Sequence, residues 1–161
     1  MKEFLEFVKN LILFLAILWA LFFFVIGVKM VPTDDMSPRL SAGDIMVYYK
    51  IDKTPSLNET IVLEKNETDY VGRVIATCGD KVEITEDSVL MVNDNMVVES
   101  NIFYKTPPYE GFIDYPVTLG PDEYFVLCDK REGGEDSRYY GPVKRDEIRG
   151  VVIGLLRRTG I

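Results

Sequence analysis

One uninterrupted run of 18 residues without a charge, Leu11 to Val28, limits the folds open to this chain more than any other feature. A helix that rises about 1.5 Å per residue crosses a bilayer core of about 30 Å with a run of this length. A buried helix of a globular core would show a polar stripe, and a cleaved signal would end in small residues spaced as Ala-x-Ala. The run shows neither pattern, so the sequence predicts an uncleaved transmembrane anchor.

Positive charges on either side of the run predict its orientation. Lys2, Lys9 and the amino terminus precede it, whereas Lys29 is the only nearby cation that follows it. Lys and Arg favour the cytoplasmic side of a membrane span. We therefore expect a single-pass protein of the cell membrane, with a cytoplasmic tip and anchor in residues 1–29 and an extracytoplasmic domain in residues 30–161.

The composition excludes several kinds of function. After Lys29 the chain contains 15 Lys and Arg against 24 Asp and Glu, so a basic nucleic-acid-binding face is not expected. The chain has no histidine, which rules out Ser-His and Cys-His catalysis as well as histidine metal sites. No EF-hand spacing of carboxylates is present, and we expect neither a metal nor another cofactor.

Beyond residue 44 the sequence is typical of short antiparallel strands. Runs rich in β-branched and aromatic residues are bounded by Gly, Pro, Asn and Asp, and they cover residues 45–49, 60–63, 70–76, 82–85 and 123–127. Residues 89–98 predict a hairpin, because Asn and Asp at its centre tolerate the positive φ of a tight turn. Residues 101–116 predict a long surface segment. The expected fold is mainly β, an antiparallel barrel or sandwich behind the single helix.

The segment between the anchor and the first of these strands reads V-P-T-D-D-M-S-P-R-L-S-A-G-D over residues 31–44. Pro32 and Pro38 lack an N–H and push the preceding residues toward extended geometry. Successive side chains of an extended segment point to opposite faces. The sequence therefore predicts that the adjacent carboxylates of Asp34 and Asp35 face opposite sides.

This segment resembles the nucleophile box of type I signal peptidases, a pattern of the form P-S/T-x-S-M-x-P-T/S-L followed by G-D. The position of the nucleophilic serine is held by Asp35, and Thr33 stands at the position on the oxyanion side. The residues that match the pattern are Pro32, Thr33, Met36, Pro38, Leu40, Gly43 and Asp44.

Two further boxes resemble the same family and follow in its order. Residues 70–80 read Y-V-G-R-V-I-A-T-C-G-D, similar to the family's Y-I-K-R-V-I-G-x-P-G-D, with Gly72 at the position of the general-base lysine. Residues 127–141 are similar to the family's G-D-N-R-x-x-S-x-D-S-R-x-x-G, with Gly134 at the position of the serine that steadies the lysine. The resemblance covers most of the chain and implies a signal-peptidase-like β-domain.

The substitutions remove the groups that a Ser-Lys peptidase needs. That mechanism requires a hydroxyl nucleophile and an unprotonated amine within hydrogen-bond reach of it, whereas Asp35 has no hydroxyl and Gly72 has no side chain. The carboxylate of Asp35 would also repel a developing oxyanion. We therefore expect no catalytic residue and interpret the chain as a pseudoenzyme.

An aspartic mechanism does not replace the missing pair. It requires two convergent carboxylates that share a proton, and Asp34 and Asp35 are expected to diverge. The resemblance implies that two other carboxylates are held in structural ion pairs with arginines, and the four residues concerned are Arg73, Asp129, Asp136 and Arg138.

The two cysteines have no histidine to activate them. Cys78 and Cys128 are interpreted as two small buried residues. A disulfide between them is the alternative, which is allowed outside the cytoplasm.

The binding geometry of the family does not depend on the missing side chains. In signal peptidases the substrate lies as an extra strand between the nucleophile segment and the lysine strand, held by backbone hydrogen bonds. The resemblance implies that these two segments are residues 29–35 and 69–72 here. Gly72 is expected to leave room for it and to permit close backbone approach. The predicted groove residues are Val31, Pro32, Thr33, Asp34, Asp35, Met36, Tyr70, Val71 and Gly72.

The resulting hypothesis is a membrane-anchored, non-proteolytic protein that binds exported polypeptide. It resembles the catalytically degenerate signal-peptidase-like proteins of Gram-positive pilus assembly, and this resemblance implies a pilin subunit or its precursor as a partner, with a sortase nearby. Two alternatives stay open. One is an active peptidase that removes signal peptides by a displaced base or an acidic mechanism, and the other is an interaction scaffold that uses residues 101–116.

Overall fold

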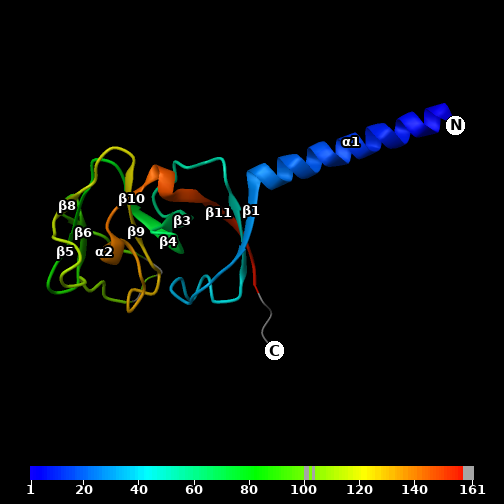
Figure 1. Ribbon diagram of the computed structural model, residues 1–161. Coiled ribbons are helices and arrows are strands. Elements are labelled where there is room, and N and C mark those ends of the chain that lie inside the picture. The colour runs from blue at the N-terminus through cyan, green and yellow to red at the C-terminus, as the bar shows by residue number, and fades with distance from the viewer. Residues whose placement is uncertain (100–101, 103, 158–161) are drawn as a thin grey trace.

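The computed structural model describes residues 1–99, 102 and 104–157. Its first element is the helix α1, Lys2–Val25, which projects away from the remainder of the chain (Figure 1). None of its residues is buried, and its 24 residues span about 36 Å at about 1.5 Å per residue. The helix is long and apolar enough to cross a membrane, as the sequence predicts.

The apolar run does not stay helical to its end. Residues 26–28, predicted within the anchor, belong instead to the strand β1, Ile26–Met30. β1 pairs antiparallel with β2, Ile45–Tyr49, and the amide of Lys50 donates to the carbonyl of Val25 at 2.9 Å. The helix therefore ends where a partner strand from later in the chain becomes available, a long-range effect that composition does not reveal.

The strands form two antiparallel sheets, so the predicted mainly β fold is confirmed. The seven-stranded sheet has the order β1-β2-β11-β3-β4-β9-β10 and the four-stranded sheet the order β7-β6-β5-β8. Figure 1 shows the strands next to α1 on one side of the domain and the small sheet on the other. The remaining bounds are β3 Thr60–Lys65, β4 Thr68–Ala76, β5 Lys81–Ile84, β6 Leu90–Val92, β7 Asn95–Met96, β8 Val117–Thr118, β9 Glu123–Leu127, β10 Val143–Lys144 and β11 Ile148–Leu156.

Local sequence explains the hairpin and one short helix. Asn93 and Asp94 turn the chain between β6 and β7 with φ of 52° and 62°, the left-handed values that Asn and Asp tolerate. The helix α2, Ser137–Tyr140, was not predicted; its N-cap is Asp136, whose side chain accepts a hydrogen bond from the amide of Arg138 at 3.0 Å. A 3₁₀ turn, η1, Arg145–Glu147, precedes β11.

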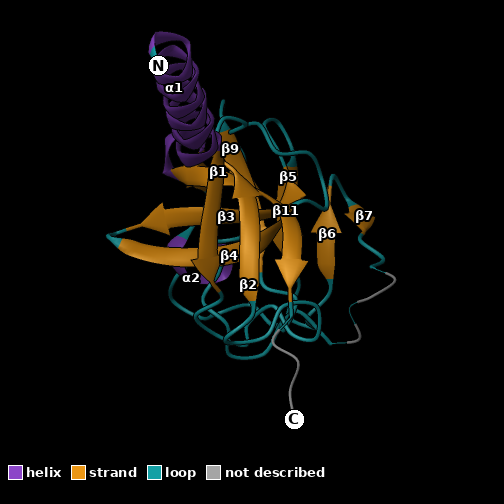
Figure 2. Cartoon of the chain, turned by 90° about the vertical axis from the view of Figure 1, so that its right-hand side faces the viewer, coloured by secondary structure: helices purple, strands orange, loops and turns teal. Residues whose placement is uncertain are grey.

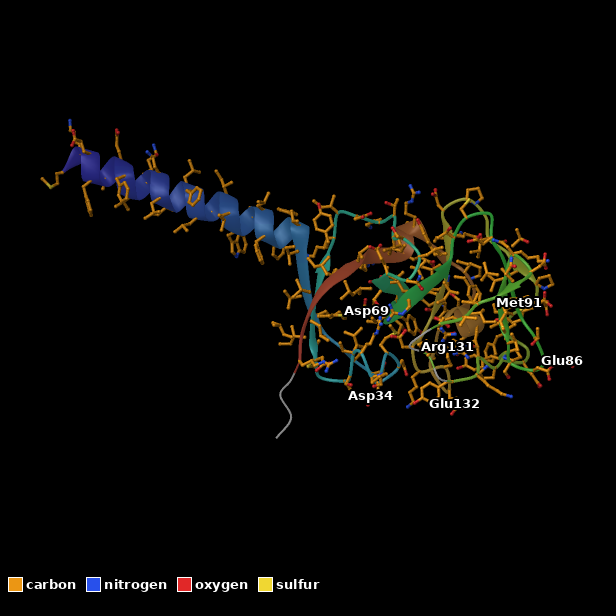
Figure 3. All side chains as sticks on the ribbon, turned by 180° about the vertical axis from the view of Figure 1, so that it is seen from behind. Asp34, Asp69, Glu86, Met91, Arg131 and Glu132 are labelled. Carbon is orange, nitrogen blue, oxygen red and sulfur yellow. The ribbon has the colours of Figure 1, made fainter. Side chains whose placement is uncertain are left out.

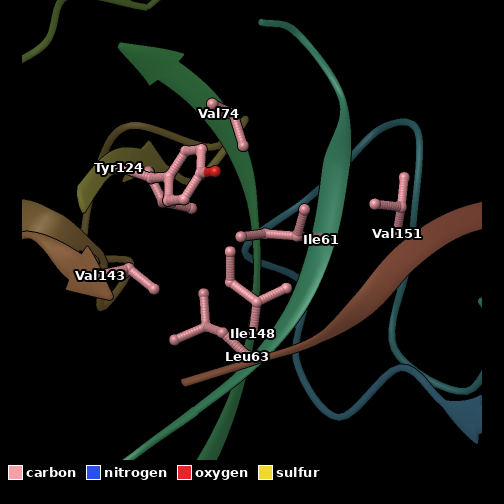
Figure 4. Packing of buried hydrophobic residues seen from close by; sticks show 8 residues of the cluster. Ile61, Leu63, Val74, Tyr124, Val143, Ile148 and Val151 are labelled. Atoms are coloured by element: carbon pink, nitrogen blue, oxygen red, sulfur yellow. The ribbon is translucent and has the colours of Figure 1, made fainter. Parts of the chain in front are cut away.

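Three apolar clusters form the core. Figure 4 shows the cluster built from β3, β4, β9, β10 and β11. A second cluster joins β9 to the small sheet through Phe125 and Leu127, and a third lies under the segment that follows β1. β9 contributes Val126 to the first cluster and Phe125 and Leu127 to the second. This strand therefore lies between the two clusters and holds the residues that follow it in place.

The outer face of the β1–β2–β11 region is apolar and exposed. The register places Val28 opposite Val47 and Met30 opposite Ile45, and directly opposed residues share a face. The side chains on this face that are more than 40% exposed are Val28, Met30, Ile45, Ile153 and Leu156. Figure 2, in which these strands lie in front, shows α1 beside the same face.

The predicted surface segment 101–116 includes residues 101 and 103, which lie outside the described residues. Residues 104–116 contain no strand, as expected, but they are held against the domain. The hydroxyl of Tyr109 donates to the carbonyl of Gly134 at 2.8 Å, and its ring lies 4.3 Å from the guanidinium carbon of Arg138. This segment therefore supports the loop that precedes α2.

Candidate functional site

The segment after β1 is folded rather than extended. Val31 continues the pairing with the start of β2, but the chain then turns: the amide of Ser37 donates to the carbonyl of Asp34 at 3.0 Å, and the amide of Leu40 to that of Met36 at 3.0 Å. The prediction of an extended segment is wrong because turning back lets Met36 and Leu40 enter the core, where they are 1% and 5% exposed. Burial of these two side chains outweighs the local preference set by the prolines.

Asp34 and Asp35 engage different groups. Oδ1 of Asp34 accepts from the amide of Ala42 at 2.8 Å, whereas Oδ2 of Asp35 accepts from the hydroxyl of Thr33 at 2.6 Å. The backbone carbonyl of Asp35 accepts from the amide of Lys130 at 2.8 Å. The two carboxylates therefore do not form a pair that shares a proton, and the Thr33 hydroxyl is already committed to Asp35.

Gly72 does not leave open space, contrary to expectation. A Cβ atom at this position would lie 2.4 Å from Cγ1 of Val126 and 3.3 Å from the carbonyl oxygen of Leu127. Real Cβ atoms do not approach other heavy atoms as closely as 2.4 Å, so any side chain here requires Val126 to move. The place where a lysine side chain would begin is filled by the neighbouring strand β9.

The position of Gly134 is tightly packed, although less so than that of Gly72. A Cβ atom there would lie 3.1 Å from both Cβ and Sγ of Cys128. Cys128 is 1% exposed, and burial, followed by the nearby carboxylates of Asp136 and Asp35, raises the pKa of its thiol well above the ordinary value. The side chain of Cys128 thus occupies the space next to Gly134 as an uncharged thiol.

The cysteines do not match the expectation that both are buried. Cys128 is buried, but Cys78 is exposed in the turn after β4, and both are free thiols. The disulfide alternative therefore does not apply to this structure.

Two buried ion pairs frame the site. Arg73 holds Asp129 with two parallel hydrogen bonds, Nε to Oδ1 at 2.7 Å and Nη2 to Oδ2 at 2.5 Å. Arg138 holds Asp136 in the same way, at 2.9 Å and 2.7 Å. Both carboxylates are at most 2% exposed. These contacts are the ones the sequence predicts, and they occupy both carboxylates with guanidinium groups.

A cleft of about 420 Å³ lies between the segment after β1 and β4. Five of the predicted groove residues line it, together with Asp69 of the predicted segment 69–72. Three further lining residues were not predicted: Thr68, Gly133 and Glu135. Val31 and Met36 were predicted in the groove but are buried in the core at 2% and 1% exposure. Asp34 and Gly72 do not line it either. The predicted residues that do are Pro32, Thr33, Asp35, Tyr70 and Val71.

The backbone of β4 presents an open edge to this cleft. The amide of Val74 donates to the carbonyl of Glu59 at 2.9 Å, toward β3, and the alternation of an antiparallel strand then directs the N–H and C=O groups of Asp69 and Val71 the other way. β9 pairs with β4 only from residue 73 onward. Within the described residues, the outward backbone groups of Asp69 and Val71 have no hydrogen-bond partner.

An ion pair joins β1 to the wall of the cleft that β4 forms. Nζ of Lys29, on β1, contacts Oδ2 of Asp69, on β4. Lys29 lies on the inward face of β1, between the outward residues Val28 and Met30. Figure 3 shows Asp69 in the middle of the domain and Asp34 at its edge. Asp69 belongs to the predicted segment 69–72, whereas Glu135 was missed because it does not hold a matched position of a motif.

The fold and site define a signal-peptidase-like β-domain behind an apolar helix, and comparison with known proteins agrees. The family model described as "Signal peptidase, peptidase S26" matches residues 4–156. The chain therefore belongs to the S26 signal peptidase family.

Individual relatives support this assignment. The probable signal peptidase I-2 of Synechocystis sp. is 32% identical over 138 residues, which cover 79% of this chain and 61% of that protein. Signal peptidase IB of Staphylococcus aureus (strain COL) is 29% identical, with 94% of this chain and 88% of that protein covered. The crystal structure of a signal peptidase I from Enterococcus faecalis V583 is similar with a TM-score of 0.51 and 26% identity, over 62% of this chain and 97% of that one. The match thus spans less than two thirds of the Synechocystis protein.

Proposed function

We propose that this protein is a non-proteolytic member of its family that holds an extended segment of an exported polypeptide at the outer face of the cell membrane. A pilin subunit or its precursor, handed on to a sortase during pilus assembly, is the partner that the sequence resemblance implies. The observation that carries the proposal is the open edge of β4 at Asp69 and Val71, in a cleft beside filled catalytic positions.

The environment of Asp35 supports the absence of proteolysis. A carboxylate stands where the hydroxyl nucleophile is needed, and the Thr33 hydroxyl donates to it at 2.6 Å instead of being free for an oxyanion. A negative charge at this point destabilises the tetrahedral intermediate of acyl transfer. Gly72 and Gly134 provide neither a base nor a supporting hydroxyl, and Val126 and Cys128 lie against these two positions.

The open edge supports binding. An added strand gains backbone hydrogen bonds from a free sheet edge without requiring particular side chains. Asp69 and Val71 offer two N–H groups and two carbonyls to such a strand, and the cleft is large enough for several residues at about 420 Å³. The opposite wall is formed by Pro32, Thr33 and Asp35.

The distribution of charge and apolar surface supports the location. Lys2 and Lys9 at the start of α1 favour a cytoplasmic amino terminus, which puts the domain outside. The exposed apolar face of the β1–β2–β11 region lies beside α1 (Figure 2), which supports a domain whose apolar face is turned toward the lipid.

Capture and cleavage of preproteins test the proposal. The full chain in detergent is given a photoreactive amino acid at Thr68, in the cleft wall, or at Glu86, at the far end of the domain (Figure 3). A panel of preproteins that includes a pilin precursor is then added. We expect crosslinks from position 68, none from position 86, and no cleavage of any preprotein.

A proline substitution separates strand addition from other contacts. Asp69→Pro removes the ion pair with Lys29 and one outward N–H of β4, but no N–H that donates to β3. Asp69→Ala removes the ion pair and keeps the N–H. Loss of one such hydrogen bond corresponds to about a tenfold loss of affinity. Capture should fall in Asp69→Pro and persist in Asp69→Ala; an equal effect of both would contradict strand addition.

The alternative of an active signal peptidase is compatible with the family and is decided by the same assay. If the wild-type chain cleaves a preprotein and Asp35→Ala abolishes the cleavage, the non-proteolytic proposal is overturned and Asp35 is catalytic. If the wild-type chain neither cleaves nor captures any preprotein, the cleft is not the functional site.

A further inference from the structure

The cleft has a pronounced negative charge. Its nine lining residues include the carboxylates of Asp35, Asp69 and Glu135 and no Lys or Arg. Asp69 is paired with Lys29, but among the described residues the carboxylates of Asp35 and Glu135 accept hydrogen bonds only from hydroxyl groups, those of Thr33 and Tyr70. Two carboxylates in the same cleft therefore have no ion pair with a Lys or Arg of the described part of the chain.

An aromatic ring accompanies one of them. The hydroxyl of Tyr70 donates to Oε2 of Glu135 at 3.0 Å, and the ring of Tyr70 packs against that of Tyr140 with 4.8 Å between centroids. Partial burial, followed by the hydrogen bond to Glu135, raises the pKa of the Tyr70 hydroxyl. Glu135 is exposed and Tyr70 is half-buried, so the carboxylate and part of the ring are accessible from the cleft.

The register of an added strand brings one of its side chains to this pair. Directly opposed residues of neighbouring strands point to the same face. A residue that lies opposite Tyr70, between the backbone contacts to Asp69 and Val71, would share the face of Tyr70, whose hydroxyl contacts Glu135. An aromatic ring next to a carboxylate is a suitable site for an ammonium or guanidinium group, which gains a cation–π contact and a charge-assisted hydrogen bond.

We propose that the cleft selects an extended segment with a lysine or arginine opposite Tyr70, bound between the Tyr70–Glu135 pair and Asp35. This inference rests on the proposed function and adds the chemical class of the segment. The two unpaired carboxylates are the specificity determinants, and the open edge of β4 supplies affinity that is independent of sequence.

Short synthetic peptides provide the test. A set of otherwise identical peptides carries lysine, norleucine or glutamate at one position, which is moved along the peptide, and binding to the full chain in nanodiscs is followed by fluorescence anisotropy. Norleucine keeps most of the lysine stem and removes the charge. For one position of the set we expect lysine to bind about tenfold more tightly than norleucine, and the difference to shrink as salt is raised to about 0.5 M.

Matched variants test which residues of the cleft cause the preference for lysine. Glu135→Gln should reduce the preference for lysine to about twofold, and Glu132→Gln, an exposed glutamate on the same loop that does not line the cleft (Figure 3), should leave it unchanged. Tyr70→Leu should weaken lysine binding more than Tyr70→Phe, which keeps the ring.

The outcomes separate this inference from the function on which it rests. Peptides that bind equally well with lysine and norleucine would overturn the cation specificity and leave strand binding intact. An equal loss in Glu135→Gln and Glu132→Gln would overturn the assignment to the Tyr70–Glu135 pair. Absence of binding by every peptide, with no capture of preproteins, would overturn the proposed function as well.

Discussion

A Cβ atom on Gly72 would lie 2.4 Å from Cγ1 of Val126, so the glycine of β4 and the valine of β9 form one packing unit. The position at which the family has its general base is therefore not an empty place from which a side chain has been removed. It is closed by a neighbouring strand that belongs to the apolar core. This relationship has a measurable consequence for stability.

Gly72→Lys should destabilise the protein by about 1–3 kcal/mol, because the new side chain overpacks the core beside Val126. Val126→Ala alone should also destabilise it, by removing buried methyl groups. The double variant should be more stable than the sum of the two single effects predicts, with a coupling of about 0.5–3 kcal/mol. Urea unfolding of the full chain in detergent measures the free energies of this double-mutant cycle. Strictly additive effects would contradict the contact between residue 72 and Val126. Thr68→Lys, on the exposed part of β4, is the control.

The buried pair of Arg73 and Asp129 should be far more sensitive to substitution than a surface pair. Asp129→Asn leaves the guanidinium of Arg73, itself 8% exposed, without its counter-charge, and breaking a buried pair costs about 3–5 kcal/mol. Glu64→Gln removes the partner of Arg149 in an exposed pair with side chains 39% and 45% accessible, where the cost is less than about 1 kcal/mol. Unfolding midpoints of the two variants are compared; similar shifts would show that Asp129 is solvated.

The two thiols should react at very different rates. Cys78 is exposed, whereas Cys128 is buried and has a pKa raised by burial and by nearby carboxylates, so it lacks both access and the thiolate form that reacts. A maleimide should label one thiol rapidly in the folded chain and both after unfolding. Cys78→Ser should abolish the rapid phase; rapid labelling in that variant would contradict the burial of Cys128.

The same thiol reports the orientation of the domain. With the domain outside the cell membrane, a membrane-impermeant maleimide added to intact spheroplasts should label Cys78 without lysis. Labelling that requires lysis would place the domain in the cytoplasm and would contradict the proposed location.

Lys50 contacts the last turn of α1 at the junction between helix and domain. Its ammonium donates to the carbonyl of Phe23 at 2.9 Å and lies 5.2 Å from the centre of that residue's ring, a favourable place for a cation because the helix C-terminus carries partial negative charge. Lys50→Met keeps the apolar stem and removes the charge. Amide hydrogen exchange of the last turn of α1 should become several-fold faster in this variant; unchanged exchange would show that the β1–β2 pairing alone holds the junction.

Much of the local structure follows from sequence pattern. The strands over 45–49 and 123–127 coincide with β2 and β9 because their residues favour strands and polar residues bound them. The turn at Asn93 and Asp94 likewise follows from what these two residues tolerate. Local preference failed after β1, where Pro32 and Pro38 favour extension but burial of Met36 and Leu40 favours a turn.

In the candidate site, too, some features follow from local sequence and others from tertiary packing. By itself the sequence determined the apolar anchor, the mainly β class, the family and the absence of a hydroxyl and an amine at Asp35 and Gly72, because these depend on composition, short motifs and residue chemistry. Only the tertiary structure decided that Val126 fills the place beside Gly72 and that Glu135 joins Tyr70 in a cleft with an open strand edge. These features depend on which strands lie next to each other, and that neighbourhood is set by packing between residues far apart in the chain.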